Sequence, residues 1–83
     1  MEKQNNKMRY DLIVKVNIDK YVNLRNSNEF MELADWKKFG TSGFRGFCLL
    51  NKEEIEKFII ETLGLESNDF QVMKANIGLY IPN

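Results

Sequence analysis

Apolar and polar residues alternate over residues 8–18, which is the most regular pattern in the chain. Apolar side chains fill the even positions: Met8, Tyr10, Leu12, Val14, Val16 and Ile18. Most odd positions are polar, and Ile13 is the exception. Because successive side chains of a strand point to opposite faces, this pattern predicts a strand with one face on a core and one in water. It favours an antiparallel or mixed sheet that is covered on one side.

A first helix is expected between residues 28 and 38. Ser27 or Asn28 can accept a hydrogen bond from a free amide of the first turn. Three apolar side chains follow at helical spacing and share one face: Phe30, Leu33 and Ala34. Gly40 suits the end of such a helix, because glycine tolerates a left-handed backbone.

A second helix is predicted at residues 52–63 by signals at both of its ends. Asn51 can cap the first turn, and the side chain of Glu54 can bond back to the amide of Asn51. The apolar residues between the ends share one face: Ile55, Phe58, Ile59 and Leu63. Gly64 stands where a left-handed C-cap belongs, and Leu65 can make the apolar contact that follows it.

Two further strands are predicted, at residues 44–50 and 70–81. The second ends before Pro82, which cannot donate a hydrogen bond to a ladder. Residues 19–26 allow either a loop or a short strand at 21–25, and we expect the loop.

These elements predict an α+β domain of two layers, in the order β-α-β-α-β. A three-stranded antiparallel or mixed sheet would carry two helices on one face, and a strand at 21–25 would add a fourth strand. Residues 1–7 are expected to form a disordered polar tail and residues 8–83 a single domain, since 83 residues allow one core. The predicted core contains Leu12, Val14, Val16, Ile55, Phe58, Ile59 and Leu63.

The composition lacks the residue types that most catalytic sites and most metal sites use. The chain contains no histidine and one cysteine, Cys48, within an apolar run. A catalytic thiol needs a base, and most zinc sites use histidine or several cysteines. We therefore expect no catalytic residue, no metal, no cofactor and no enzyme activity. The chain shows no signal segment and no apolar run of roughly 20 residues, so the cytoplasm is the expected location.

Residues 39–46, FGTSGFRG, resemble the FGTSG-x-RG signature of the phosphohexomutases. The resemblance implies a segment at the rim of an active site, with Arg45 near a bound sugar phosphate. It covers eight residues, and the chain has neither a serine loop of the TASHNP type nor a DxDxD magnesium loop. We therefore do not assign the chain to that family.

The same glycine-rich turn also has a physical interpretation that needs no family. Backbone amides in such a turn can point one way and hold an anion. Thr41 and Ser42 would supply hydroxyl groups, and Arg45 could bind a phosphate through two hydrogen bonds. A phosphate-ligand-binding domain that uses these three residues is one alternative function. A plain turn at the end of the first helix is the simpler interpretation.

Charge is separated along the chain, although the formal net charge is zero. Residues 51–69 contain six acidic residues and two lysines. An acidic face on the helix predicted in this segment can associate with a basic surface. Apolar groups outside the core can also mark an interface. The expected function is a non-enzymatic module that binds another protein, as an inhibitor or adaptor of the kind that phages and mobile elements encode. The candidate contact residues are Glu53, Glu56, Glu61, Trp36 and Phe39.

A small nucleic-acid-binding module is the other alternative. Basic residues would form one side of the outer sheet face, and a tyrosine nearby would stack on a base: Lys7, Arg9, Lys15 and Arg25, with Tyr10 or Tyr21. The lack of a basic excess argues against it, because phosphate contacts supply most non-specific affinity. No membrane partner is expected, and self-association stays open.

Overall fold

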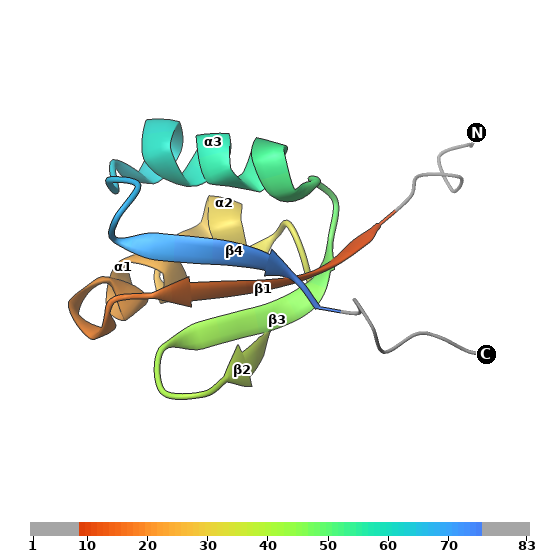
Figure 1. Cartoon of the computed structure of the whole chain (residues 1–83), viewed down its shortest axis with the longest axis horizontal. Coiled ribbons are helices and arrows are strands. Elements are labelled where there is room, and N and C mark those ends of the chain that lie inside the picture. Colours follow the sequence, from red (N-terminus) through yellow and green to blue (C-terminus); the bar gives the residue numbers. More distant parts are fainter. Residues whose placement is uncertain (1–8, 76–83) are drawn as a thin grey trace.

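The alternating segment forms one of the two central strands of a four-stranded sheet (Figure 1). The computed structural model describes residues 9–75. In it, β1 (Tyr10–Val16) lies between β3 (Gly43–Cys48) and β4 (Phe70–Lys74). The short strand β2 (Lys37–Phe39) pairs with the other side of β3, and every neighbouring pair is antiparallel. The predicted α+β class with an antiparallel sheet is confirmed.

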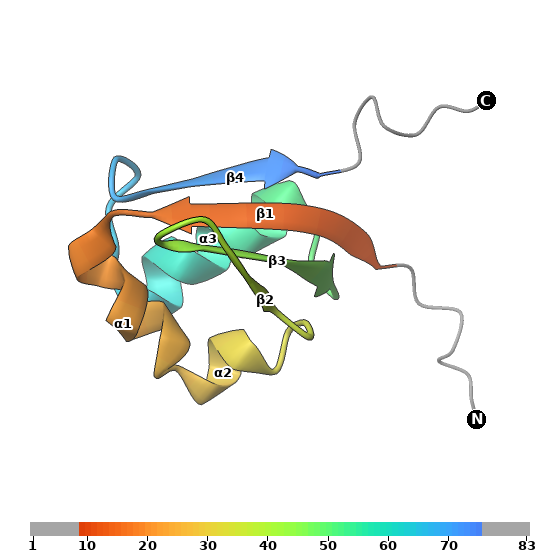
Figure 2. The same ribbon diagram turned by 90° about the horizontal axis from the view of Figure 1, so that it is seen from below.

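The helices lie on one side of this sheet (Figures 1 and 2). They are α1 (Tyr21–Arg25), which a 3-10 helix (Ile18–Lys20) precedes, α2 (Asn28–Met31) and α3 (Lys52–Leu63). The even-numbered side chains of β1 meet them in one buried cluster with Leu24, Phe30, Ile55 and Ile59. The opposite face of the sheet is covered by no helix or strand of the described residues.

The number of elements differs from the prediction, since the sheet has four strands instead of three and there are three α-helices instead of two. The segment 19–26 forms neither the expected loop nor the alternative strand at 21–25. It is helical because Tyr21 and Leu24, three residues apart, both pack inward: Leu24 is fully buried and the ring of Tyr21 stacks on Phe44.

The first predicted helix is also wrong beyond its first turn. Ser27 caps it as expected, through its hydroxyl and the amide of Phe30. The indole N–H of Trp36 then donates to the carbonyl oxygen of Phe30 at 2.8 Å, so this carbonyl is bound by a side chain after the helix has ended. Residues 37–39 pair with β3 as the edge strand β2, and Gly40 opens a β-hairpin turn with φ of 68°.

The second predicted helix is confirmed over its whole length. The amide of Glu54 donates to the side chain of Asn51 at 2.8 Å, and the amide of Asn51 donates to Glu54 at 3.0 Å. Gly64 adopts the left-handed conformation with φ of 77°, and the amide of Leu65 donates to the carbonyl of Ile59. Leu65 is buried, so the C-cap carries the expected apolar contact.

The two remaining predicted strands are both present, and β3 ends two residues earlier than predicted. β3 covers Gly43–Cys48 and β4 covers Phe70–Lys74. The predicted continuation of the last strand to residue 81 lies outside the described residues, and so does the predicted tail at residues 1–7. None of the described helices combines the length and the apolar character that crossing a membrane requires.

Stacked aromatic rings fill the core between β3 and the two short helices. Phe30 and Trp36 are stacked with ring centroids 4.7 Å apart, and Phe44 meets both rings edge-on. Gly46 makes room for this cluster, because a Cβ atom there would lie 3.2 Å from the Trp36 ring. Two residues of the predicted core, Phe58 and Leu63, are only half-buried at its margin.

Candidate binding surfaces

The predicted acidic contact residues are spread over the outer side of α3. Glu53 and Glu61 are exposed, whereas Glu56 is half-buried and accepts a hydrogen bond from Lys52 at 2.9 Å. This bond and the charge of Glu56 raise the pKa of Lys52. Other acids of the segment serve local structure: Glu54 completes the capping box, and Asp69 accepts from the amide of Glu66. The acidic surface therefore offers fewer unengaged carboxylates than the sequence suggests.

The two apolar contact residues of the prediction have opposite environments. Trp36 is only 9% exposed and stacks within the core, so the prediction that it lies outside the core is wrong. Phe39 is 36% exposed and lies on the open face of the sheet, opposite Gly43. A Cβ atom on Gly43 would lie 3.5 Å from the Phe39 ring, so the ring rests against the bare backbone of β3.

The glycine-rich turn does not gather its three predicted ligands. The Ser42 hydroxyl donates to the carbonyl of Val16 at 2.6 Å, while Arg45 donates to both carboxylate oxygens of Asp11 at 3.3 and 3.1 Å. Asp11 and Val16 lie at opposite ends of β1, about 16 Å apart for a strand of this length. Thr41 is exposed. In this structure Ser42 and Arg45 thus bind partners at opposite ends of β1, and a phosphate site of Thr41, Ser42 and Arg45 stays a prediction.

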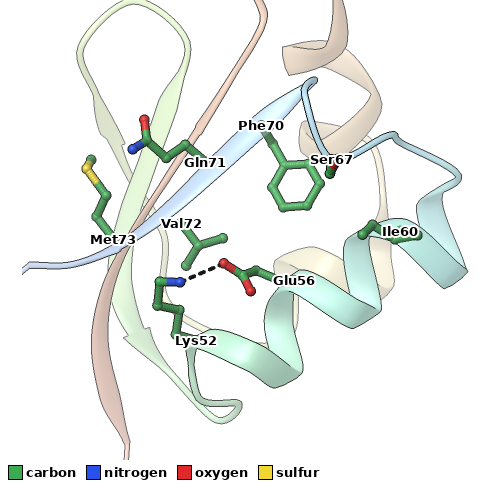
Figure 3. A pocket seen from close by; sticks show the side chains of 8 residues that line it. All are labelled: Lys52, Glu56, Ile60, Ser67, Phe70, Gln71, Val72 and Met73. Carbon is green, nitrogen blue, oxygen red and sulfur yellow. Dashed lines mark hydrogen bonds and ion pairs between the residues drawn. The ribbon is translucent and has the colours of Figure 1, made fainter.

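A groove runs between α3 and β4 (Figure 3). It encloses about 530 Å³ and is lined by Lys52, Glu56, Ile60, Ser67, Phe70, Gln71, Val72 and Met73. Ile60 is 42% exposed on the helix side, and the half-buried ring of Phe70 lies on the strand side. The Lys52–Glu56 ion pair closes one end of the apolar stretch (Figure 3). The groove thus combines an apolar floor with a charged rim.

The backbone of β4 presents a free edge beside this groove. Ladder bonds run from the amide of Asn17 to the carbonyl of Asp69 and from the amide of Ala75 to the carbonyl of Asp11. They require the odd-numbered residues of β4 to bond to β1, because bonding directions alternate along an antiparallel strand. The N–H and C=O groups of Phe70, Val72 and Lys74 consequently point away from β1. No strand within residues 9–75 pairs with that side.

The open face of the sheet carries a second set of side chains in three rows, among which Ile13 and Gly43 are buried. Cross-strand register places Phe39, Gly43, Lys15 and Gln71 in the first row; Lys37, Arg45, Ile13 and Met73 in the second; and Phe47 and Asp11 in the third. Phe47 is 60% exposed, more than any other aromatic residue described. The guanidinium of Arg9 donates to the carbonyl of Phe47 and adds a further cation at this end.

The buried side of the molecule offers little chemistry. Burial raises the pKa of the Cys48 thiol, and a thiol held in its neutral form is a weak nucleophile. Among residues 9–75, no three potential metal-ligating side chains of histidine, cysteine or acidic type lie close enough together to hold an ion.

Comparison with known proteins returns nothing: no family model, no curated protein and no solved structure matches the chain. The surfaces must be interpreted from their own geometry. Sequence reasoning missed the exposure of Phe47 and the free edge of β4. The position of Phe47 between two inward residues, Gly46 and Cys48, carries the signal for the first, since alternation along β3 turns it outward.

Proposed function

We propose that the protein is a non-enzymatic binding module that receives an extended segment of a partner protein along the free edge of β4. The observation that carries the proposal is the row of outward backbone groups on β4 beside the α3–β4 groove. Strand addition of this kind draws its affinity from main-chain hydrogen bonds and its specificity from pockets for alternate side chains.

The α3–β4 groove provides the pocket for alternate side chains that gives such binding its specificity. A strand added to β4 would direct every other side chain toward α3, where Ile60 and Phe70 offer apolar contact. Glu53 and Glu61 stand exposed on the same helix. Their charge favours a partner segment in which an apolar residue is flanked by lysine or arginine. An inhibitor or an adaptor can both act in this way, by occupying a segment that another protein would use.

A selection of random linear peptides on the full chain tests this proposal. The peptides recovered should contain an apolar residue near basic ones. In hydrogen exchange, their binding should protect the outward amides of Phe70, Val72 and Lys74. Lys74→Pro removes one outward donor and should weaken the peptide at least about tenfold, whereas Lys74→Ala, which keeps that donor, should have a smaller effect.

The groove itself is tested by Ile60→Glu, which should weaken the same peptide by placing a charge on the apolar floor. Ile18→Glu is the matched control, because Ile18 is also an exposed isoleucine and does not line the groove. The proposal is wrong if the selected peptides leave the β4 amides unprotected, or if the two glutamate substitutions weaken binding equally.

A further inference from the structure

The open face of the sheet, defined as the three rows given above together with Arg9, lies on the side of the sheet away from the helices. It shares Gln71 and Met73 with the α3–β4 groove, but strand addition does not explain its other residues. Its character differs from that of α3. Four cationic side chains stand on it, Arg9, Lys15, Lys37 and Arg45. They are opposed by the carboxylates of Asp11 and Asp35 and, beside Lys15 at the edge of the face, by that of Asp69. We propose that this face binds a single-stranded nucleic acid, with its phosphates on the cations and its bases on the two exposed phenylalanine rings.

The carboxylate of Asp11 does not cancel the positive charge that the open face presents to solvent. The Asp11 side chain is 7% exposed, and both of its oxygens accept hydrogen bonds from Arg45. Arg45 uses two of its five N–H groups in this pair and stays more exposed than its partner. The carboxylate of Asp11 is thus covered and neutralised, while the remaining donors of Arg45 are available to an anion.

A like-charge pair lies at the centre of the face. Lys37 stands directly opposite Arg45 in the β2–β3 register, an arrangement that destabilises a sheet when nothing compensates it. Asp35 lies 3.5 Å from the Lys37 ammonium, but both groups are largely exposed and such a pair contributes little. A phosphate bound between Lys37 and Arg45 would contact both cations and relieve their repulsion.

Two aromatic rings flank these cations. Phe39 rests against the backbone of Gly43 with its other side outward, and Phe47 projects four residues further along β3. The two positions are about 13 Å apart along the strand. Aromatic rings between cationic groups form the arrangement on which unpaired bases stack, and any base can use it because every base has a π-face. Paired bases inside a duplex cannot reach such rings, so the expected ligand is single-stranded.

The net charge of zero does not oppose this assignment. Five of the 12 acidic residues lie at positions 53–66, in α3 or just after it, and α3 packs on the covered side of the sheet. Asp69 lies instead near Lys15 at one end of the open face, where the cations named above stand. Local potential, rather than total charge, steers a charged ligand to a surface. The tyrosines that the sequence suggested for stacking do not serve here, because Tyr10 is half-buried against the core and Tyr21 is stacked on Phe44.

Fluorescence anisotropy with labelled 12-nucleotide oligo(dT), oligo(rU) and a DNA duplex of the same length tests the inference on the full chain at 50 mM salt. The single strands should bind more tightly than the duplex, and the DNA and RNA arms report which sugar is preferred. Phe47→Ala should weaken single-strand binding about tenfold, and Phe47→Trp should retain it. Val22→Ala is the control for removing an exposed apolar group elsewhere, since Val22 is 57% exposed on α1, and it should leave binding unchanged.

Salt dependence tests the charge contacts separately. Lys15→Ala should reduce the slope of log affinity against log salt by about 0.7, the value for one phosphate of a single strand. Lys57→Ala, which removes an exposed cation from α3, should leave the slope unchanged. The inference is overturned if no single strand binds, if the duplex binds equally well, or if Phe47→Ala is silent while the variant melts as a folded protein. A peptide from the selection above that contacts Phe47 would instead make this face a protein site.

Discussion

The two faces of the sheet use aromatic residues in opposite ways. On the covered face, Phe30, Trp36 and Phe44 are buried against one another. On the open face, Phe39 and Phe47 project from neighbouring strands and keep much of their surface in water. The first group supplies burial and therefore stability, whereas the second contributes little to stability and is available for contacts with another molecule. The role of an aromatic residue in this sheet therefore depends on whether its side chain lies on the covered face or on the open face.

The largest expected effect separates the two groups by stability. Phe30→Ala should lower the free energy of unfolding by about 3–5 kcal/mol, because it removes a fully buried ring from the centre of the stack. Phe47→Ala should change it by about 1 kcal/mol or less, since the ring is mostly in water. Urea denaturation of both variants measures the difference. Equal losses would mean that Phe47 is packed in solution and that the two faces do not differ as described.

The glycines of β3 sharpen the comparison, because each face has one glycine with an aromatic ring beside it. A Cβ atom on Gly43 would lie 2.6 Å from the carbonyl oxygen of Phe39, which is backbone and cannot move cheaply. On Gly46 the closest approach is 3.2 Å. Gly43→Ala should therefore destabilise by about 1–3 kcal/mol and Gly46→Ala by less. Thermal unfolding of both variants checks the order, and the reverse order would contradict this account of the open face.

The smallest expected effect concerns pH and the covered face. Burial raises the pKa of the Cys48 thiol above its unfolded value. Its contribution to stability is therefore complete below the unfolded thiol pKa and is lost as pH rises through the folded one. Between pH 7 and pH 10 the wild type should lose more stability than Cys48→Ala, which has no thiol at this position. Parallel losses in urea denaturation at the two pH values would show that the thiol does not contribute.

Local signals predicted those parts of the fold that depend on neighbours in sequence. The helix at 52–63 was predictable because its capping residues, Asn51 and Gly64, act within one turn of its ends. β1 was predictable because one of its faces is uniformly apolar. The segment 28–39 was not, because its course depends on the bond from Trp36 to Phe30 and on pairing with β3, and both are tertiary interactions.

The candidate surfaces were harder to predict for a related reason. Gly46 faces the core without a side chain, so the sequence shows two large apolar residues, Phe44 and Phe47, with no apolar side chain between them to mark alternation. The sequence suggested one anion site for Thr41, Ser42 and Arg45, but Ser42 and Arg45 bind partners at opposite ends of β1. The free edge of β4 depends on strand order, which a pattern of polar and apolar positions does not contain.

The central place of β1 also has a consequence for how the chain folds. β3 begins at Gly43, 27 residues after β1 ends at Val16, and β4 begins at Phe70, 54 residues after it. Closing such long loops before any contact stabilises them slows folding. During synthesis from the N-terminus β1 is made before both partners, and the edge of β1 that pairs with β4 stays unpaired until β4 has been made. β1 is the strand that the sequence pattern predicts most clearly, and it is nevertheless among the last to be paired on both of its edges.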